Sequence, residues 1–177
     1  QTAGPQRVIY VIPYLNILEQ TAEAFYKALG VVPDDGTLLE HHSLAYAGRD
    51  LRERFDESEP ENPWARRMEE NWEAPIVLTT SVQFFESLFS HRPGAARKLH
   101  HIARSVVIFD ECQTFPAGLY RPTLDVLQHL VSTYGVSFVF CTATQPALKR
   151  SVSLPEGIPG VAVRDIMGSG TDAIFSH

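Results

Sequence analysis

The sequence has 177 residues, of which 44% are hydrophobic and 20% charged, and its formal net charge is −6. These values suit one globular domain and exclude a protein whose whole surface is basic. The two cysteines, Cys112 and Cys141, are too few for a disulfide framework and lack the CxxC spacing of a metal site. Without about 18 consecutive apolar residues or a signal-peptide pattern, we expect a cytoplasmic protein with no membrane span.

Four short apolar runs predict strands. They are nearly continuous rather than alternating, which is typical of strands that a parallel sheet buries on both faces. The runs cover residues 8–12, 76–78, 106–109 and 136–141. Helical patterns lie between the runs and predict helices over residues 16–29, 62–72, 81–89, 95–103 and 122–134. This alternation predicts an α/β fold, a three-layer sandwich with a mainly parallel sheet and helices on both faces.

Local signals predict where elements end and where the domain stops. Gly30 is expected to end the first helix, and Ser81 is a possible N-terminal cap of the third. The charged segment 47–63 predicts a solvated helix end and loop, and segment 153–167 predicts turns around a short strand. We therefore expect one domain over residues 1–167, followed by a linker over residues 168–177.

Polar residues follow each predicted strand. In chain order they are Pro13-Tyr14, Thr79-Thr80-Ser81, Asp110-Glu111 and Thr142-Ala143-Thr144. In open α/β sheets, ligands bind at the carboxyl ends of the strands. The sequence therefore predicts a binding site at this edge of the sheet.

Asp110 and Glu111 form the motif that points most specifically to one chemistry. A hydrophobic strand that ends in Asp and then Glu is the Walker B arrangement of nucleoside triphosphatases. There the Asp helps to hold Mg²⁺, directly or through a water molecule, and the Glu orients the attacking water. The alternative is an exposed acidic turn after a buried strand.

The remaining polar groups have competing interpretations. The sequence FCTAT at residues 140–144 looks like helicase motif III, although threonines also cap helices and a helix is expected after Gln145. The pairs His41-His42 and His100-His101 lack an evident third ligand, so we do not predict a metal site there. The helical spacing of the phenylalanines in segment 84–89 favours core packing.

Four motifs in this order resemble those of superfamily 2 helicases, and the residues within them resemble those of the Cas3-type CRISPR-associated family. The matching stretches are VIYVIPYLNILEQ, LTTSVQFFE, DECQTFP and TAT, and the similarity extends from about residue 7 to 175. The resemblance implies the first RecA-like domain of a DExD/H-box motor that uses ATP and Mg²⁺. It also implies single-stranded DNA, a guide-RNA surveillance complex, a second RecA-like domain and an HD nuclease domain as partners.

The resemblance also implies roles for individual residues. Those implied in catalysis are Asp110, which would also serve Mg²⁺, together with Glu111, Gln113, Thr142 and Thr144. Those implied along the DNA path are Pro13, Tyr14, Thr79, Thr80, Ser81 and Gln83. Hydroxyl groups and amides at a helix N-terminus suit phosphate oxygens. For Tyr14 and Gln83 ordinary packing is the alternative.

The phosphate-binding loop, G-x-x-x-x-G-K-[ST], does not occur in the sequence. We therefore expect a RecA-like domain that is incomplete at its N-terminal strand, and negligible ATPase activity for the chain alone. A missing central strand would leave two strand edges exposed. The alternatives are a domain of another superfamily 2 helicase and a non-catalytic module that binds nucleic acid or protein.

Overall fold

The computed structural model describes residues 6–33, 35–41, 71–89, 93–112 and 120–141. In chain order its elements are β1 (Arg7–Ile12), α1 (Leu15–Leu29), β2 (Leu38–His41), β3 (Ile76–Thr80), α4 (Ser81–Phe89), α5 (Pro93–Ile102), β4 (Ser105–Phe109), α6 (Tyr120–Tyr134) and β5 (Ser137–Phe140). The strands form a five-stranded sheet in the order β2-β3-β1-β4-β5, and every neighbouring pair is parallel. The predicted α/β class is confirmed, and the arrangement is consistent with a RecA-like fold.

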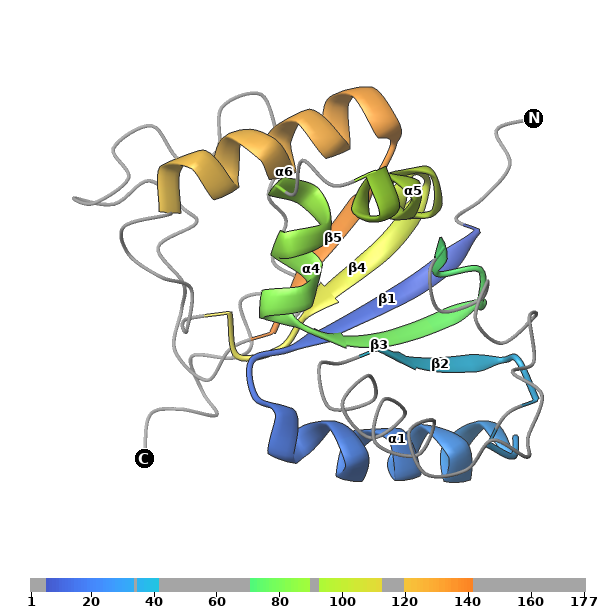
Figure 1. Ribbon diagram of the computed structural model, residues 1–177. Coiled ribbons are helices and arrows are strands. Elements are labelled where there is room, and N and C mark those ends of the chain that lie inside the picture. The colour runs from blue at the N-terminus through green and yellow to red at the C-terminus, as the bar shows by residue number, and fades with distance from the viewer. Residues whose placement is uncertain (1–5, 34, 42–70, 90–92, 113–119, 142–177) are drawn as a thin grey trace, which may run out of the picture.

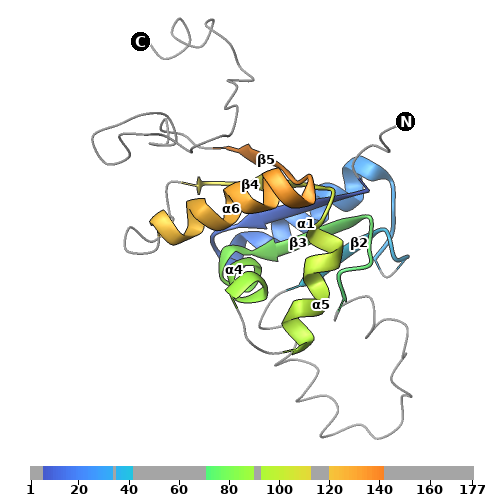
Figure 2. The ribbon, with the colours of Figure 1, turned by 90° about the horizontal axis from the view of Figure 1, so that it is seen from above.

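Helices cover both faces of the sheet, as predicted. Helix α1 lies against one face, and α4, α5 and α6 lie against the other (Figures 1 and 2). Two apolar clusters fill the spaces between these layers. The larger cluster joins the sheet to α4, α5 and α6, and the smaller joins it to α1 through Leu18 and Ala22. The sheet is therefore the middle layer of three.

The four predicted strands are confirmed, and β2 is an additional one. Strand β2 has only four residues, and two of them, Glu40 and His41, are polar. Among the described strands it pairs with β3 alone, with Leu38 opposite Ile76. Since β2 is short and half polar, no continuous apolar run marks it in the sequence.

The five described strands form one continuous sheet. Strand β1 is central, with Val11 paired to Thr79 of β3 on one side and to Phe109 of β4 on the other. The two edges of the described sheet belong to β2 and β5.

Two helix ends show why the chain turns where it does. Helix α1 ends at Gly30, which has φ 67° and donates its N–H to the carbonyl oxygen of Tyr26 at 3.0 Å. A positive φ of this size favours glycine, so the predicted stop is confirmed. At the start of α4, Thr80 rather than Ser81 is the cap, because the Thr80 hydroxyl accepts the N–H of Gln83 at 3.3 Å.

Phe109 is the centre of an aromatic cluster between the sheet and α4. Its ring stacks on Phe85, Phe138 and Phe140 and meets Phe84 edge-on at 5.2 Å between centroids. The core position predicted for Phe84 is confirmed, since it is fully buried. Phe89 is 50% exposed and only borders the cluster, so its predicted core position is wrong.

Several predictions lie outside the described residues. They concern the segments 47–63, 153–167 and 168–177, and most of the helix predicted over residues 62–72. Within the described ranges, no helix is long and apolar enough to span a membrane.

Candidate nucleotide and nucleic-acid site

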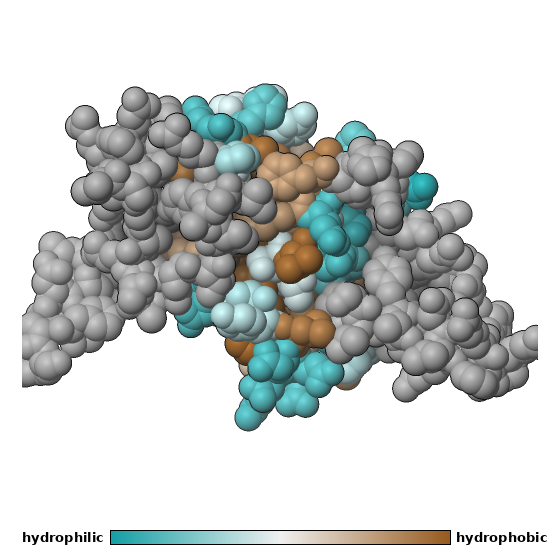
Figure 3. Space-filling view, turned by 60° about the vertical axis from the view of Figure 1, so that its left-hand side comes forward, coloured by the Kyte–Doolittle hydropathy of each residue, from teal (hydrophilic) through white to brown (hydrophobic). Residues whose placement is uncertain are grey.

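The predicted site residues of β1, β3 and β4 meet at one edge of the sheet. Because Ile12 pairs with Thr80 and Val11 with Phe109, the chain leaves these three strands at nearly the same level. Pro13, Ser81 and Asp110 therefore follow the strand ends side by side. Figure 3 turns this edge toward the viewer and shows apolar surface between strongly polar side chains.

Hydrogen bonds fix the position of Asp110. Its backbone N–H donates to the carbonyl oxygen of Val11 at 2.9 Å, which continues the pairing of β4 with β1 by one residue. The hydroxyl of Tyr10 donates to Oδ2 at 3.1 Å, and the N–H of Glu111 lies 3.0 Å from Oδ1. Each carboxylate oxygen thus has a donor of its own, so the side chain is held in one orientation.

The surroundings of Asp110 perturb two neighbouring groups. Burial, the charge of Asp110 and the hydrogen bond to it raise the pKa of Tyr10 to about 12. Burial and the same carboxylate also raise the pKa of the Cys141 thiol. Tyr10 therefore remains a hydrogen-bond donor to Asp110 at neutral pH.

Glu111 has a left-handed backbone. Its φ is 49°, a conformation that costs a non-glycine residue about 1 kcal/mol or more. The chain bends here, directly after β4, and the Glu111 side chain is partly exposed at the sheet edge. Strained backbone of this kind is found most often at functional sites.

The ladder between β4 and β5 continues beyond both strands. Cys141 donates its N–H to the carbonyl oxygen of Phe109 at 2.8 Å, and Cys112 donates its own to the carbonyl oxygen of Cys141 at 3.2 Å. The predicted motif III segment therefore begins beside the Asp110-Glu111 turn. Gln113, Thr142 and Thr144 themselves lie outside the described residues.

Thr79 lies beneath the surface rather than on it. It is fully buried, and its hydroxyl donates to the carbonyl oxygen of His41 at 2.9 Å. The imidazole of His41 is also buried, with Nε2 3.0 Å from the Lys98 ammonium, which lies 5.2 Å from the Trp72 ring centroid. Burial of Thr79 does not support its direct contact with DNA. His41 thus lies in a buried polar cluster within the fold.

Thr80 is also buried and caps α4, whereas Pro13, Tyr14, Ser81 and Gln83 have more access to solvent. Tyr14 is 54% exposed and precedes the first turn of α1, and Pro13 is partly exposed beside it. Ser81 and Gln83 are partly exposed in the first turn of α4, where Gln83 donates to the Glu86 carboxylate at 3.0 Å. The structure thus brings the first turns of α1 and α4 to the same edge as Asp110.

The acidic pair suits a lightly coordinated Mg²⁺. Among the described residues, no group of three or more His, Cys, Asp or Glu side chains is arranged to hold a metal ion. Mg²⁺ in nucleotide sites takes one or two carboxylates and completes its shell with water and phosphate oxygens. One oriented carboxylate at Asp110 fits that donor set, whereas a protein-only metal cage does not.

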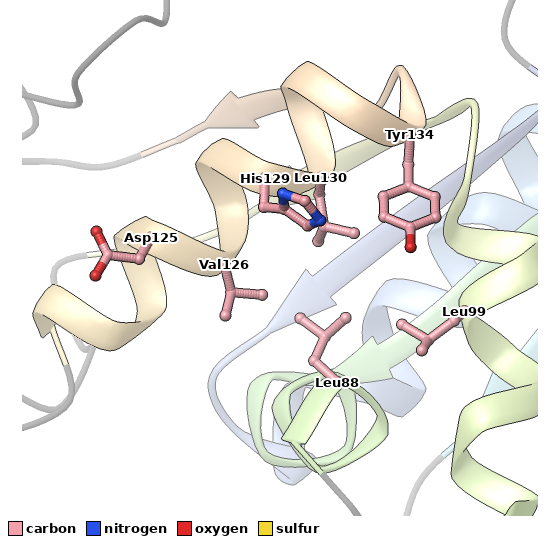
Figure 4. A pocket seen from close by; sticks show the side chains of 7 residues that line it. All are labelled: Leu88, Leu99, Asp125, Val126, His129, Leu130 and Tyr134. Atoms are coloured by element: carbon pink, nitrogen blue, oxygen red, sulfur yellow. The ribbon is translucent and has the colours of Figure 1, made fainter.

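An apolar pocket of about 330 Å³ lies on the face covered by α4, α5 and α6. Figure 4 shows Leu88, Leu99, Val126 and Leu130 pointing into it, with Asp125, His129 and Tyr134 around them. None of these residues belongs to the predicted site, so the pocket is separate from the Asp110 edge.

Sequence reasoning missed Tyr10 and Lys98 as members of polar clusters. Tyr10 stands inside an apolar strand, where aromatic residues are common and carry no polar signal. The Lys98 ammonium meets His41 across 57 positions of sequence, which only the folded chain reveals.

Comparison with known proteins agrees with the resemblance carried by the motifs. No protein-family model matches the sequence. The chain is 34% identical over 155 residues to a protein of Haloferax volcanii described as "CRISPR-associated nuclease/helicase Cas3". The aligned part is 84% of this chain and 16% of that relative, so the chain spans about a sixth of the relative's length. The chain belongs to the Cas3-type helicases and corresponds to one segment of such a protein.

Proposed function

We propose that the chain forms part of the ATP-dependent motor of a CRISPR-associated helicase-nuclease, which moves on and unwinds target DNA in the cytoplasm. One observation carries the proposal. Asp110 is oriented from both sides at the carboxyl edge of a parallel sheet, next to the point where the Thr-Ala-Thr segment begins. Ligands of open α/β sheets bind at this edge.

The residues divide the chemical work between them. Asp110 would hold Mg²⁺ through a coordinated water or directly, and the bound ion would neutralise charge on the β- and γ-phosphates. Glu111 would orient and polarise the attacking water. Gln113 would hydrogen-bond toward the γ-phosphate. Thr142 and Thr144 would couple the bound nucleotide to the strength of DNA binding.

The first turns of α1 and α4 would form part of a single-stranded DNA track. Tyr14 offers an exposed ring on which a base can stack, and Ser81 and Gln83 lie where helix N-terminal amides favour a phosphate. Pro13 would shape the turn before α1, and Thr80 would act mainly by capping α4. We assign Thr79 a supporting role because it is buried.

The rest of the motor would come from other parts of a longer protein. The sequence has no phosphate-binding loop, and the relative is about six times as long as the aligned segment. The proposed partners are a second RecA-like domain, an HD nuclease domain, a guide-RNA surveillance complex and the DNA strand that complex displaces. The 177-residue chain alone would show negligible ATP hydrolysis.

The test is the Glu111→Gln variant in a protein that carries this chain together with a phosphate-binding loop. DNA-stimulated ATP turnover should fall by about 100-fold or more, because the amide cannot accept a proton from water. Glu23→Gln, an exposed position on α1, is the matched control and should retain turnover. Turnover that does not depend on Glu111 would contradict the motor function and favour a non-catalytic binding module. Turnover by the isolated chain would contradict its predicted inactivity.

A further inference from the structure

Tyr10, an aromatic residue inside the apolar run 8–12, donates a hydrogen bond to Asp110 of the acidic pair Asp110-Glu111. It lies on β1, opposite Ile108 of β4, and its hydroxyl crosses to Asp110 Oδ2 at 3.1 Å. The central strand thus supplies a donor to a carboxylate that stands at the end of its neighbour. Nothing in the motif comparison assigns a role to this residue.

The ring of Tyr10 is itself held in place. It meets Phe25 of α1 edge-on, with 5.3 Å between centroids and 70° between planes. Tyr10 and Phe25 both pack against the apolar cluster that contains Ile12, Leu18 and Leu78. Because these contacts leave the phenol little freedom, its hydroxyl occupies a defined point next to Asp110.

The two bonds to Asp110 act together. The Glu111 N–H, a backbone group, holds Oδ1 at 3.0 Å, and the Tyr10 hydroxyl holds Oδ2 at 3.1 Å. A single donor would leave the carboxylate free to rotate about its last torsion, whereas two donors on different oxygens fix the plane of the group. Each oxygen keeps lone pairs for a further partner at the sheet edge.

We propose that Tyr10 is a positioning residue that orients the Asp110 carboxylate toward its Mg²⁺-water partner. This inference rests on the proposed motor function, because it assumes that Asp110 serves a metal-nucleotide complex. Partners that orient a metal-binding carboxylate typically change affinity or activity by about 10–100-fold when they are removed.

The experiment compares Tyr10→Phe with Tyr26→Phe in the longer protein that carries a phosphate-binding loop. Tyr26 is a matched control. It packs against the same apolar cluster as Tyr10, but its hydroxyl donates to the Glu40 carboxylate at 3.0 Å instead of to Asp110. Mn²⁺ replaces Mg²⁺ as the probe, and its binding to the complex with a non-hydrolysable ATP analogue is measured by electron paramagnetic resonance. ATP turnover is measured in parallel.

Tyr10→Phe should weaken Mn²⁺ binding and lower kcat by about tenfold with little change in KM for ATP, and Tyr26→Phe should match the parent protein. Wild-type Mn²⁺ affinity and kcat in Tyr10→Phe would overturn the inference, as would equal losses in both tyrosine variants. Phe25→Leu is the second variant, for use if Tyr10→Phe does not fold. It loosens the ring without touching Asp110, so it should weaken Mn²⁺ binding by a smaller factor, and an unchanged affinity would again overturn the inference.

Asp110→Asn separates this inference from the proposed function. If Asp110→Asn abolishes turnover while Tyr10→Phe changes nothing, the motor function stands and the role of Tyr10 is wrong. If Asp110→Asn retains full turnover, both fail. In the Asp110→Asn background, adding Tyr10→Phe should cause no further loss of Mn²⁺ affinity, and an additional tenfold loss would overturn the role of Tyr10.

Discussion

The hydroxyl of Thr79 donates to the carbonyl oxygen of His41 at 2.9 Å, inside the sheet and out of contact with solvent. The bond joins the ends of β2 and β3, and β2 is an edge strand of the described sheet. Thr79, which was expected to contact DNA, therefore contributes a buried hydrogen bond that stabilises the sheet.

Replacement of Thr79 by Val should lower the free energy of unfolding by about 1–3 kcal/mol, because the buried His41 carbonyl loses a donor. Urea unfolding followed by circular dichroism measures the loss. Thr133→Val, which removes an exposed hydroxyl from the last turn of α6, is the control and should change stability little. Equal stabilities for both variants would contradict the structural role of Thr79.

Thr80→Ala should destabilise the start of α4 by about 1 kcal/mol, because the Gln83 N–H loses its side-chain acceptor. Thr80→Ser keeps the oxygen and should preserve most of the stability. Ser81→Ala should cost less than Thr80→Ala, since Ser81 is already inside the helix. The reverse order in a thermal melt would restore Ser81 as the cap.

Arg7→Met should lower stability by about 1–3 kcal/mol. The guanidinium donates from Nε to the carbonyl oxygen of Ala74 at 3.1 Å and from Nη1 to that of His101 at 2.7 Å. The first bond ties β1 to the segment before β3, and the second ties it to the last turn of α5, where a cation is favourable. Burial lowers the pKa of Arg7, and Glu73 partly offsets this effect. Lys27→Met, at an exposed site, should have little effect on urea unfolding.

Lowering the pH should reduce the free energy of unfolding, in part because His101 takes up a proton. Burial, and then the charge of Arg7, lower the pKa of this histidine below its ordinary value of 6.5. The unfolded chain therefore takes up the proton first, so the contribution is complete above about pH 6.5 and is lost as pH falls through the folded-state pKa. Unfolding measured between pH 7.5 and 5 should show a shallower loss for His101→Gln. An identical slope in both proteins would contradict the prediction.

The sequence indicated the fold through its longest apolar runs but not the order of the strands. The run at 8–12 packs on both faces of the sheet, with Ile9 and Val11 in the larger apolar cluster and Tyr10 and Ile12 at the smaller. In the run at 106–109, Val107 and Phe109 belong to the larger cluster. Nothing in either run states that β1 lies between β3 and β4. Consequently the strand order was not predicted, and β2, with its two polar residues, was missed.

The candidate site was predictable where a residue's role follows from its position at a strand end. Asp110 and Tyr14 are such residues, and the structure places both at the carboxyl edge. The burial of Thr79 was not predicted, because its hydrogen-bond partner, the His41 carbonyl, is 38 positions away in sequence. Tyr10 was missed because its partner is 100 positions away in sequence.

The left-handed backbone of Glu111 sets folding and chemistry against each other at a single position. Glycine would adopt φ 49° without strain, so a chain selected for stability alone would gain from it there. A Glu111→Gly protein would then be folded, at least as resistant to urea, and without the carboxylate that the proposed reaction requires. Screens that rank variants by stability alone would accept that substitution, and only an assay of turnover would reject it.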